Sequence, residues 1–149
     1  MPADGLGILP RHVVEGHHVP PEKLGQLKLT TVCLEHGKPE PRPAMKYQIV
    51  PIAQYTDKAE VQELCRMVGT GALAQRVAQA AAWNLANGIS WQELAAKQLR
   101  FANGARRPYF SPQEIQAGMQ AATMATQLAE KNRDTDTESN SKEGSLSQY

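Results

Sequence analysis

A cysteine and a glutamine are the two residues of this sequence whose side chains could combine chemically. Cys33 lies in the apolar run Thr-Val-Cys-Leu, and Gln79 lies in the middle of an alanine-rich stretch. A thiolate held against a glutamine carboxamide can displace ammonia and leave an internal thioester. Because an acyl thioester is an electrophile, it needs a setting that keeps water away until a nucleophile arrives. The plainer interpretation of Gln79 is a core amide that is hydrogen-bonded to a neighbouring backbone.

The stretch around Gln79 is typical of a helix that is buried on every side. From Val77 to Ala86 the string VAQAAAWNLA carries no charge and leaves no polar face on a helical wheel. We therefore expect a helix over residues 72–86 to be the central one, with the other elements packed round it. Trp83 follows Gln79 by one helical turn, so its ring is expected to lie beside the carboxamide and to shield it.

Three further helices are predicted from capping signals, in which a short polar residue is followed three positions later by glutamate. The pairs Asp57–Glu60, Ser90–Glu93 and Ser111–Glu114 have this pattern. They predict helices over residues 58–68, 91–101 and 112–130.

The first third of the chain is rich in proline and is predicted to contain the strands. Residues 27–34 and 45–52 are runs of β-branched and apolar residues, which favour a hairpin over residues 27–52. Residues 1–26 are expected to be an arm or loop, and the polar residues 131–149 a disordered tail. The expected fold class is mainly α (α+β): a four-helix domain with a central Ala-rich helix and a short N-terminal β-hairpin.

Length and charge restrict the possible partners. A chain of 149 residues predicts one domain, and 16 Lys and Arg against 15 Asp and Glu leave a net charge of +1. This balance argues against a nucleic-acid partner, which usually meets a basic field. No apolar run approaches the roughly 20 residues that span a bilayer. The first residues show no signal peptide, and the two cysteines cannot form a disulfide framework.

The string Ala78-Gln79-Ala80-Ala81-Ala82-Trp83 resembles the Thr-Gln-x-Ala-x-Trp signature of bacterial surface thioester domains, with Ala78 in place of the threonine. In that family an upstream cysteine on a strand is linked to the glutamine of the motif, and Cys33 fits this order. The continuation to Trp91 is similar to uncharacterised secreted proteins of planctomycete-like bacteria.

The resemblance implies covalent, single-turnover attachment to an amine-bearing surface partner, at the cell surface or outside the cell and without a cofactor. Cys33 then accepts the acyl group that Gln79 donates. The alternative from a different class is a non-catalytic helical interaction domain, in which both residues are structural. Neither interpretation identifies the partner or the oligomeric state.

Other residues near Cys33 allow competing interpretations. His36 is a candidate base that assists thioester chemistry, against the plainer interpretation of a solvated loop histidine. Cys33 and His36 also have metal-ligand spacing, but no second ligand pair completes a zinc site, and we expect no metal. Cys65 is expected to be a buried core residue, or else to form a disulfide with Cys33 that prevents a thioester.

Three arginines, Arg100, Arg106 and Arg107, gather before the aromatic residues Tyr109 and Phe110. Arginines interleaved with aromatic side chains can bind phosphates or a nucleic-acid strand. In a chain of nearly neutral charge we interpret them as a solvated loop.

Overall fold

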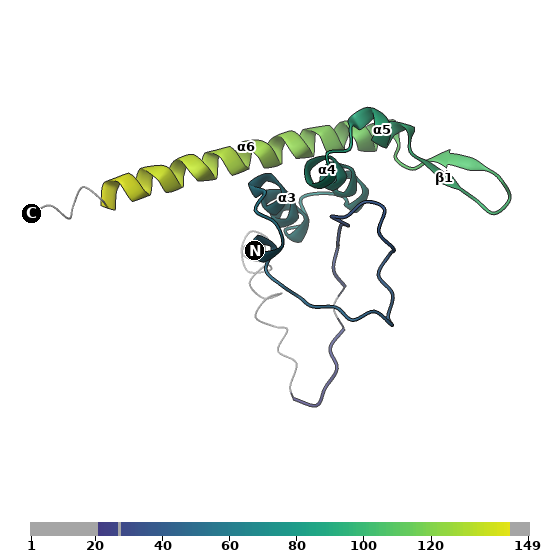
Figure 1. The fold of residues 1–149 in the computed structure, drawn as a ribbon, viewed down its shortest axis with the longest axis horizontal. Coiled ribbons are helices and arrows are strands. Elements are labelled where there is room, and N and C mark those ends of the chain that lie inside the picture. Colours follow the sequence, from purple (N-terminus) through teal and green to yellow (C-terminus); the bar gives the residue numbers. More distant parts are fainter. Residues whose placement is uncertain (1–20, 27, 144–149) are drawn as a thin grey trace, which may run out of the picture.

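The computed structural model describes residues 21–143 apart from residue 27, and within this part helices predominate (Figure 1). The mainly α class is therefore confirmed. The helices are α2 (Ile52–Tyr55), α3 (Ala59–Gly69), α4 (Gln75–Asn87), α5 (Trp91–Ala96) and α6 (Pro112–Glu143), and the strands are β1 (Gln98–Arg100) and β2 (Arg106–Pro108). Residues 1–20 of the expected N-terminal arm lie outside the described residues, and residues 21–26 form neither helix nor strand.

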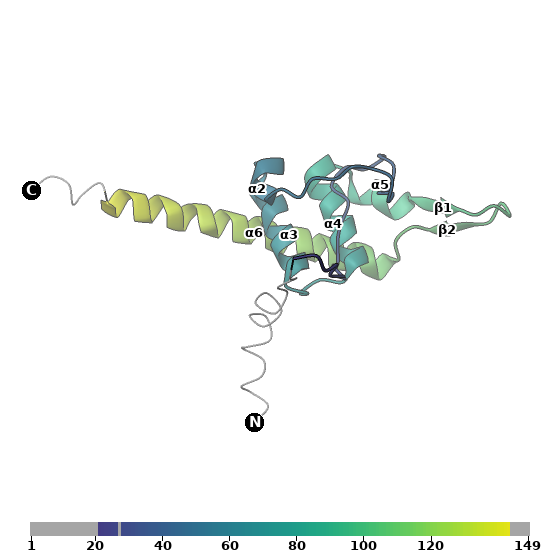
Figure 2. The ribbon, with the colours of Figure 1, turned by 90° about the horizontal axis from the view of Figure 1, so that it is seen from below.

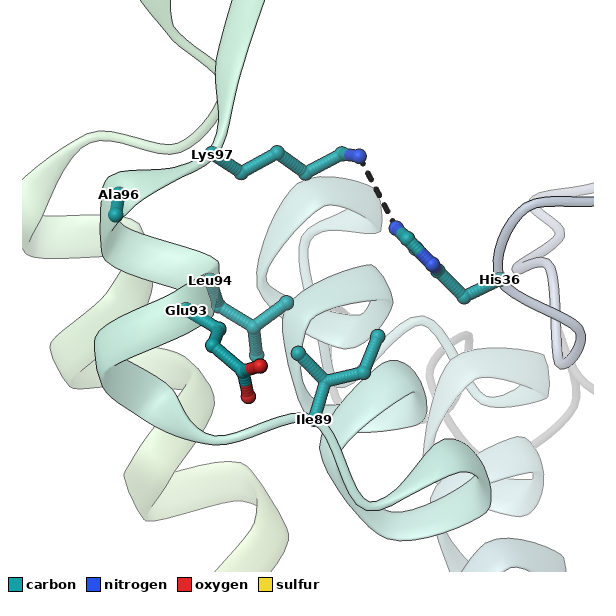
Figure 3. A pocket seen from close by; sticks show the side chains of 6 residues that line it. All are labelled: His36, Ile89, Glu93, Leu94, Ala96 and Lys97. Atoms are coloured by element: carbon teal, nitrogen blue, oxygen red, sulfur yellow. Dashed lines mark hydrogen bonds between the residues drawn. The ribbon is translucent and has the colours of Figure 1, made fainter.

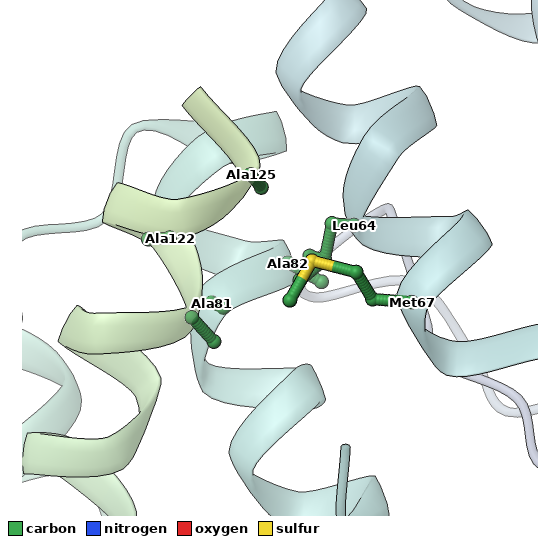
Figure 4. Packing of buried hydrophobic residues seen from close by; sticks show 7 residues of the cluster. Leu64, Met67, Ala81, Ala82, Ala122 and Ala125 are labelled. Atoms are coloured by element: carbon green, nitrogen blue, oxygen red, sulfur yellow. The ribbon is translucent and has the colours of Figure 1, made fainter. Parts of the chain in front are cut away.

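The core is a three-helix contact in which α6 packs across both α3 and α4 (Figure 1). Alanines on α4 and α6 face the larger side chains of α3, so the helices approach closely. Figure 4 shows this cluster, formed by Leu64, Met67, Ala81, Ala82, Ala121, Ala122 and Ala125. On α6 the buried alanines at 121, 125 and 129 recur every four residues, which places them on one helical stripe.

Helix α4 is central, as the sequence predicts. It lies between α6 and the irregular chain before α3, which runs on the other side of α3 and α4 (Figures 1 and 2). Its contact with α6 is close at Gly118, where an added Cβ would lie 3.1 Å from the Ala80 Cβ and 3.3 Å from the Trp91 ring, so that these neighbours would have to shift. Helix α4 ends at Gly88, whose φ of 67° is in the left-handed region that favours glycine.

Two of the three predicted capping boxes are present. Ser90 and Glu93 exchange both capping hydrogen bonds at the start of α5. At the start of α6 the Ser111 and Glu114 backbone N–H groups donate to each other's side chains, at 2.8 and 3.1 Å. The box predicted at Asp57 is wrong, because α3 follows an N-cap at Lys58 that has no side-chain capping bond.

The predicted N-terminal hairpin is wrong. Among the described residues of 27–52 no strand forms, and Ile52 begins α2 instead. The hairpin of this protein is β1–β2, in which Leu99 is paired with Arg107. The physical reason is that side chains of α4 occupy backbone hydrogen-bonding groups of the predicted first strand, and prolines interrupt the chain before the second.

Two helix boundaries also differ from the expectation. Helix α5 ends at Ala96 rather than at residue 101, because Lys97 is extended and begins the hairpin. Helix α6 continues to Glu143, so residues 131–143 of the expected disordered tail are helical and the rest lie outside the described residues. Asn132 Nδ2 donates to Glu63 Oε1 at 2.8 Å, which fastens the start of this extension to α3.

Candidate functional site

The structure brings Cys33 and Gln79 together through the backbone of Cys33. The Cys33 N–H donates to Gln79 Oε1, and Gln79 Nε2 donates to the Cys33 carbonyl, each at 2.8 Å. Gln79 is only 6% exposed, so its amide depends on these partners. Two hydrogen bonds between the same pair of residues fix the plane of the carboxamide against the Cys33 backbone.

The Gln79 contact belongs to a row of side chains on one face of α4. This row binds the backbone of the irregular segment in the way that a neighbouring strand would. Gln75, Gln79, Trp83 and Asn87 are spaced four residues apart and therefore share one face of the helix. Gln75 Nε2 donates to the Thr31 carbonyl at 3.2 Å. At the other end, Asn87 Oδ1 accepts from the His36 N–H at 3.1 Å. Residues 31–36 therefore run along α4 with their backbone held by side-chain amides.

The Cys33 thiol points away from these amide bonds. Its Sγ lies 3.2 Å from the Glu35 carbonyl oxygen, to which the thiol donates. The neighbouring side chains of Val32 and Leu34 pack against the helical core. Because Cys33 itself is exposed, its thiol is open to solvent while the carboxamide beneath it is buried.

Cys65 is less buried than the core position that the sequence predicts. It lies on α3, half-buried, and burial raises the pKa of its thiol. Both cysteines are free in the structure. The thiol of Cys65 is therefore the less reactive of the two by burial, since the thiolate is the nucleophile.

Trp83 lies at the centre of an aromatic cluster one turn beyond Gln79. Its ring is 4.7 Å from the His36 ring in an edge contact and 5.9 Å from the Phe110 ring. Trp83 is 7% exposed, and within the described residues its Nε1 has no hydrogen-bond partner. The indole therefore closes the space between α4 and the segment that carries His36.

His36 is held by Lys97 as well as by Asn87. Figure 3 shows the two side chains reaching toward each other across a cavity of about 440 Å³, with 3.0 Å between His36 Nε2 and Lys97 Nζ. Partial burial, and then the positive charge of Lys97, lower the pKa of the His36 imidazole. The ring is therefore neutral near pH 7, and its Nε2 accepts from the ammonium instead of standing free as a base.

A second cavity of about 670 Å³ opens beside Cys33. Apolar and aromatic side chains of the irregular segment and of α2 form most of its wall, among them Leu34, Tyr47, Ile49 and Tyr55. Glu35 and Lys38 contribute an ion pair of 2.7 Å at this wall. The thiol therefore borders a hollow in which another molecule could approach it.

The described residues contain no cluster of three or more His, Cys, Asp or Glu that could hold a metal ion. The other three histidines of the sequence, His12, His17 and His18, lie outside the described residues. Within the described part, no helix is long and apolar enough to cross a membrane.

Sequence reasoning missed Gln75, Asn87 and Lys97, which hold the segment around Cys33. The signal was present for the two amides, because their spacing from Gln79 is a multiple of four residues. No comparable signal identifies Lys97, whose contact with His36 depends on the end of α5. The chain matches no family model, no curated protein and no solved structure.

Proposed function

We propose that this chain is an attachment module in which Cys33 and Gln79 form an internal thioester that acylates an amine of a surface partner. The observation that supports it is the paired contact between the Gln79 carboxamide and the backbone of Cys33, residues 46 positions apart. Thioester formation further requires the thiol, which donates to the Glu35 carbonyl in this structure, to turn toward the Gln79 carbonyl carbon.

The proposed reaction has two steps. In the first, the Cys33 thiol gives up its proton and the thiolate attacks Gln79 Cδ, so that the S–C bond forms. The C–N bond then breaks, and the nitrogen takes up that proton and leaves as ammonia. In the second, a primary amine attacks the same carbon, an amide bond forms, and the Cys33 thiol is released. No oxidant or cofactor enters either step, and each chain reacts once.

The existing hydrogen bonds suit both steps. The Cys33 N–H donates to Gln79 Oε1, the oxygen on which negative charge develops when the carbonyl carbon is attacked. Loss of ammonia removes the bond from Nε2 to the Cys33 carbonyl. In the proposed amide product, the carbonyl oxygen can still accept the bond from the Cys33 N–H.

The Gln79 carbonyl carbon is shielded from water on one side, and an amine can approach it from the other. The Gln79 carboxamide is buried between α4 and the backbone of Cys33, while Cys33 itself lies on the wall of the second cavity. The mainly apolar wall limits the water around the acyl carbon, and the open side admits an amine carried on a flexible chain. His36 does not act as the base in this scheme, because its Nε2 is occupied by Lys97.

The second candidate function is a non-catalytic interaction domain, and one observation favours it. Both polar groups of the Gln79 amide already have partners, and the Cys33 thiol donates to Glu35. In this case Gln79 serves to fasten residues 31–36 to the helices, and the surface of that segment does the binding.

Intact mass with thiol alkylation separates the two functions. The thioester predicts a mass lower than that of the sequence by one ammonia, one alkylatable thiol, and addition of methylamine at Gln79. Cys33→Ser and Gln79→Glu should each abolish the ammonia deficit, whereas Cys65→Ser should retain it. Full mass with two alkylatable thiols refutes the thioester. A deficit of two hydrogens that reductant reverses indicates a disulfide instead.

A further inference from the structure

The β1–β2 hairpin projects away from the helices, and Lys97 at its base joins it to the site described above. Figures 1 and 2 show it extending beyond the end of α5. Every residue of both strands is exposed. The hairpin therefore contributes little to the core, and its side chains are available to another molecule.

The strand register places two arginines side by side. Arg100 is paired directly with Arg106 across the ladder. Two hydrogen bonds of the hairpin fix the alternation: the Phe101 N–H donates to the Ala105 carbonyl, and the Tyr109 N–H donates to the Lys97 carbonyl. The pairs Phe101–Ala105 and Lys97–Tyr109 are therefore hydrogen-bonded pairs. By alternation, Arg100 and Arg106 form a non-hydrogen-bonded pair, in which side chains lie closest and like charges repel.

Nothing nearby neutralises these charges. From residue 94 to residue 113 the sequence has four cationic residues and no Asp or Glu. Within the described residues the three ion pairs involve Lys38, Arg66 and Arg76, and none reaches the hairpin. Arg107 lies on the other face of the hairpin, with its guanidinium 5.8 Å from the centre of the Phe101 ring. Among the residues that the structure describes, none therefore supplies an anion to the face that carries Arg100 and Arg106.

The outer edge of β1 is open as well. In this register the N–H and C=O groups of Gln98 and Arg100 point away from β2. The opposite edge is weaker, because Pro108 has no N–H to offer. An extended peptide can add to such an edge as a further strand, with main-chain hydrogen bonds for affinity and alternate side chains for specificity.

We propose that the hairpin is a docking arm for an acidic, extended segment of a partner protein. The segment adds to the free edge of β1 and places carboxylates on the face that carries Arg100 and Arg106. Arginine suits this role because its guanidinium binds a carboxylate through two parallel hydrogen bonds. The open edge and the net charge of +1 favour a peptide over a nucleic acid, for which a broad basic surface is usual.

Fluorescence polarisation of a labelled peptide of alternating Glu and Val tests whether the charges of Arg100 and Arg106 contribute to binding. We expect the whole chain to bind it, and more weakly as salt increases. The double variant Arg100→Glu, Arg106→Glu should weaken binding by at least about tenfold, since two charge-assisted contacts become repulsive. Arg42→Glu, an exposed arginine outside the hairpin, is the matched control and should leave binding unchanged. Absence of binding by the unaltered chain overturns the proposal.

Gln98→Pro tests strand addition separately from charge. It removes an outward N–H that the hairpin does not use, and Lys97 already has the extended backbone that a following proline requires. We expect about fivefold weaker peptide binding, the effect of one lost hydrogen bond. Binding that survives this change unaltered overturns the strand-addition model. Tighter binding of a single-stranded DNA of equal charge, insensitive to Gln98→Pro, overturns the choice of a peptide partner.

Discussion

Replacing Gln79 with alanine should release the segment around Cys33 from α4. The Gln79 side chain makes two hydrogen bonds of 2.8 Å to Cys33, from a residue that is only 6% exposed. At roughly 1 kcal/mol for each such bond, the loss is about 2 kcal/mol. Because Cys33 is exposed, water can satisfy its backbone once the amide is gone, so no further penalty is expected on that side.

Hydrogen exchange at the Cys33 amide measures this loss directly, because that N–H is the donor to Gln79 Oε1. A loss of about 2 kcal/mol corresponds to exchange roughly 30-fold faster. The comparison is best made in a Cys33→Ser background, in which no thioester can form and the backbone contacts remain. The core of α3 and α6 should exchange as before, since the opening is local.

Gln75→Ala is the matched control for this experiment. Gln75 lies one turn earlier on the same stripe, but makes a single, longer bond of 3.2 Å to Thr31 and is exposed. We expect Gln75→Ala to speed hydrogen exchange at the amide of residue 33 by no more than about twofold. Equal and small effects of Gln75→Ala and Gln79→Ala would mean that the paired amide contact does not hold the segment, and the reasoning would be refuted.

Three further predictions concern pH, packing and an ion pair. The pKa of the His36 imidazole is lowered in the folded protein, so the unfolded chain binds a proton at this residue more readily. The free energy of unfolding should therefore fall as the pH drops below 6.5. In melting experiments His36→Asn should make this decline smaller. Gly118→Val should lower the free energy of unfolding by about 2 kcal/mol in urea titrations, because the added groups overpack the α4–α6 contact. Arg76→Lys should lower the free energy of unfolding by about 1 kcal/mol, because a lysine cannot bind Glu114 and the Tyr109 carbonyl together. An unchanged midpoint of the urea titration would contradict this.

The features that could be predicted from the sequence depend on neighbouring residues. The capping boxes at Ser90 and Ser111 and the helix stop at Gly88 involve residues within one or two turns, so the local sequence is enough to identify them. The central helix follows in the same way from the uncharged stretch between Val77 and Ala86. The proximity of Cys33 and Gln79 was a chemical hypothesis, and the structure places their backbone and side chain in contact.

The strands could not be placed because their pattern has a second explanation. Residues 28–34 have the apolar pattern of a strand, but the backbone groups of Thr31 and Cys33 are bound by side-chain amides of α4 instead of by a second strand. The true hairpin has only three residues in each strand and no apolar alternation. Its clearest signal is Asn103-Gly104 at the turn, where Gly104 has a φ of 81°.

The amide stripe of α4 also bears on whether attachment chemistry can occur without unfolding the site. Conversion of Gln79 to an acyl group removes one hydrogen bond, from Nε2 to the Cys33 carbonyl. Gln75 and Asn87 still hold Thr31 and His36 on either side of Cys33, and neither takes part in the reaction. In the proposed thioester the S–C bond itself joins residue 33 to α4, so the segment would stay on the helix although the hydrogen bond from Nε2 is lost. Gln79 thus fastens the segment and is also the residue that the proposed reaction would consume. Its structural role is therefore measured in the Cys33→Ser background, in which no thioester can form.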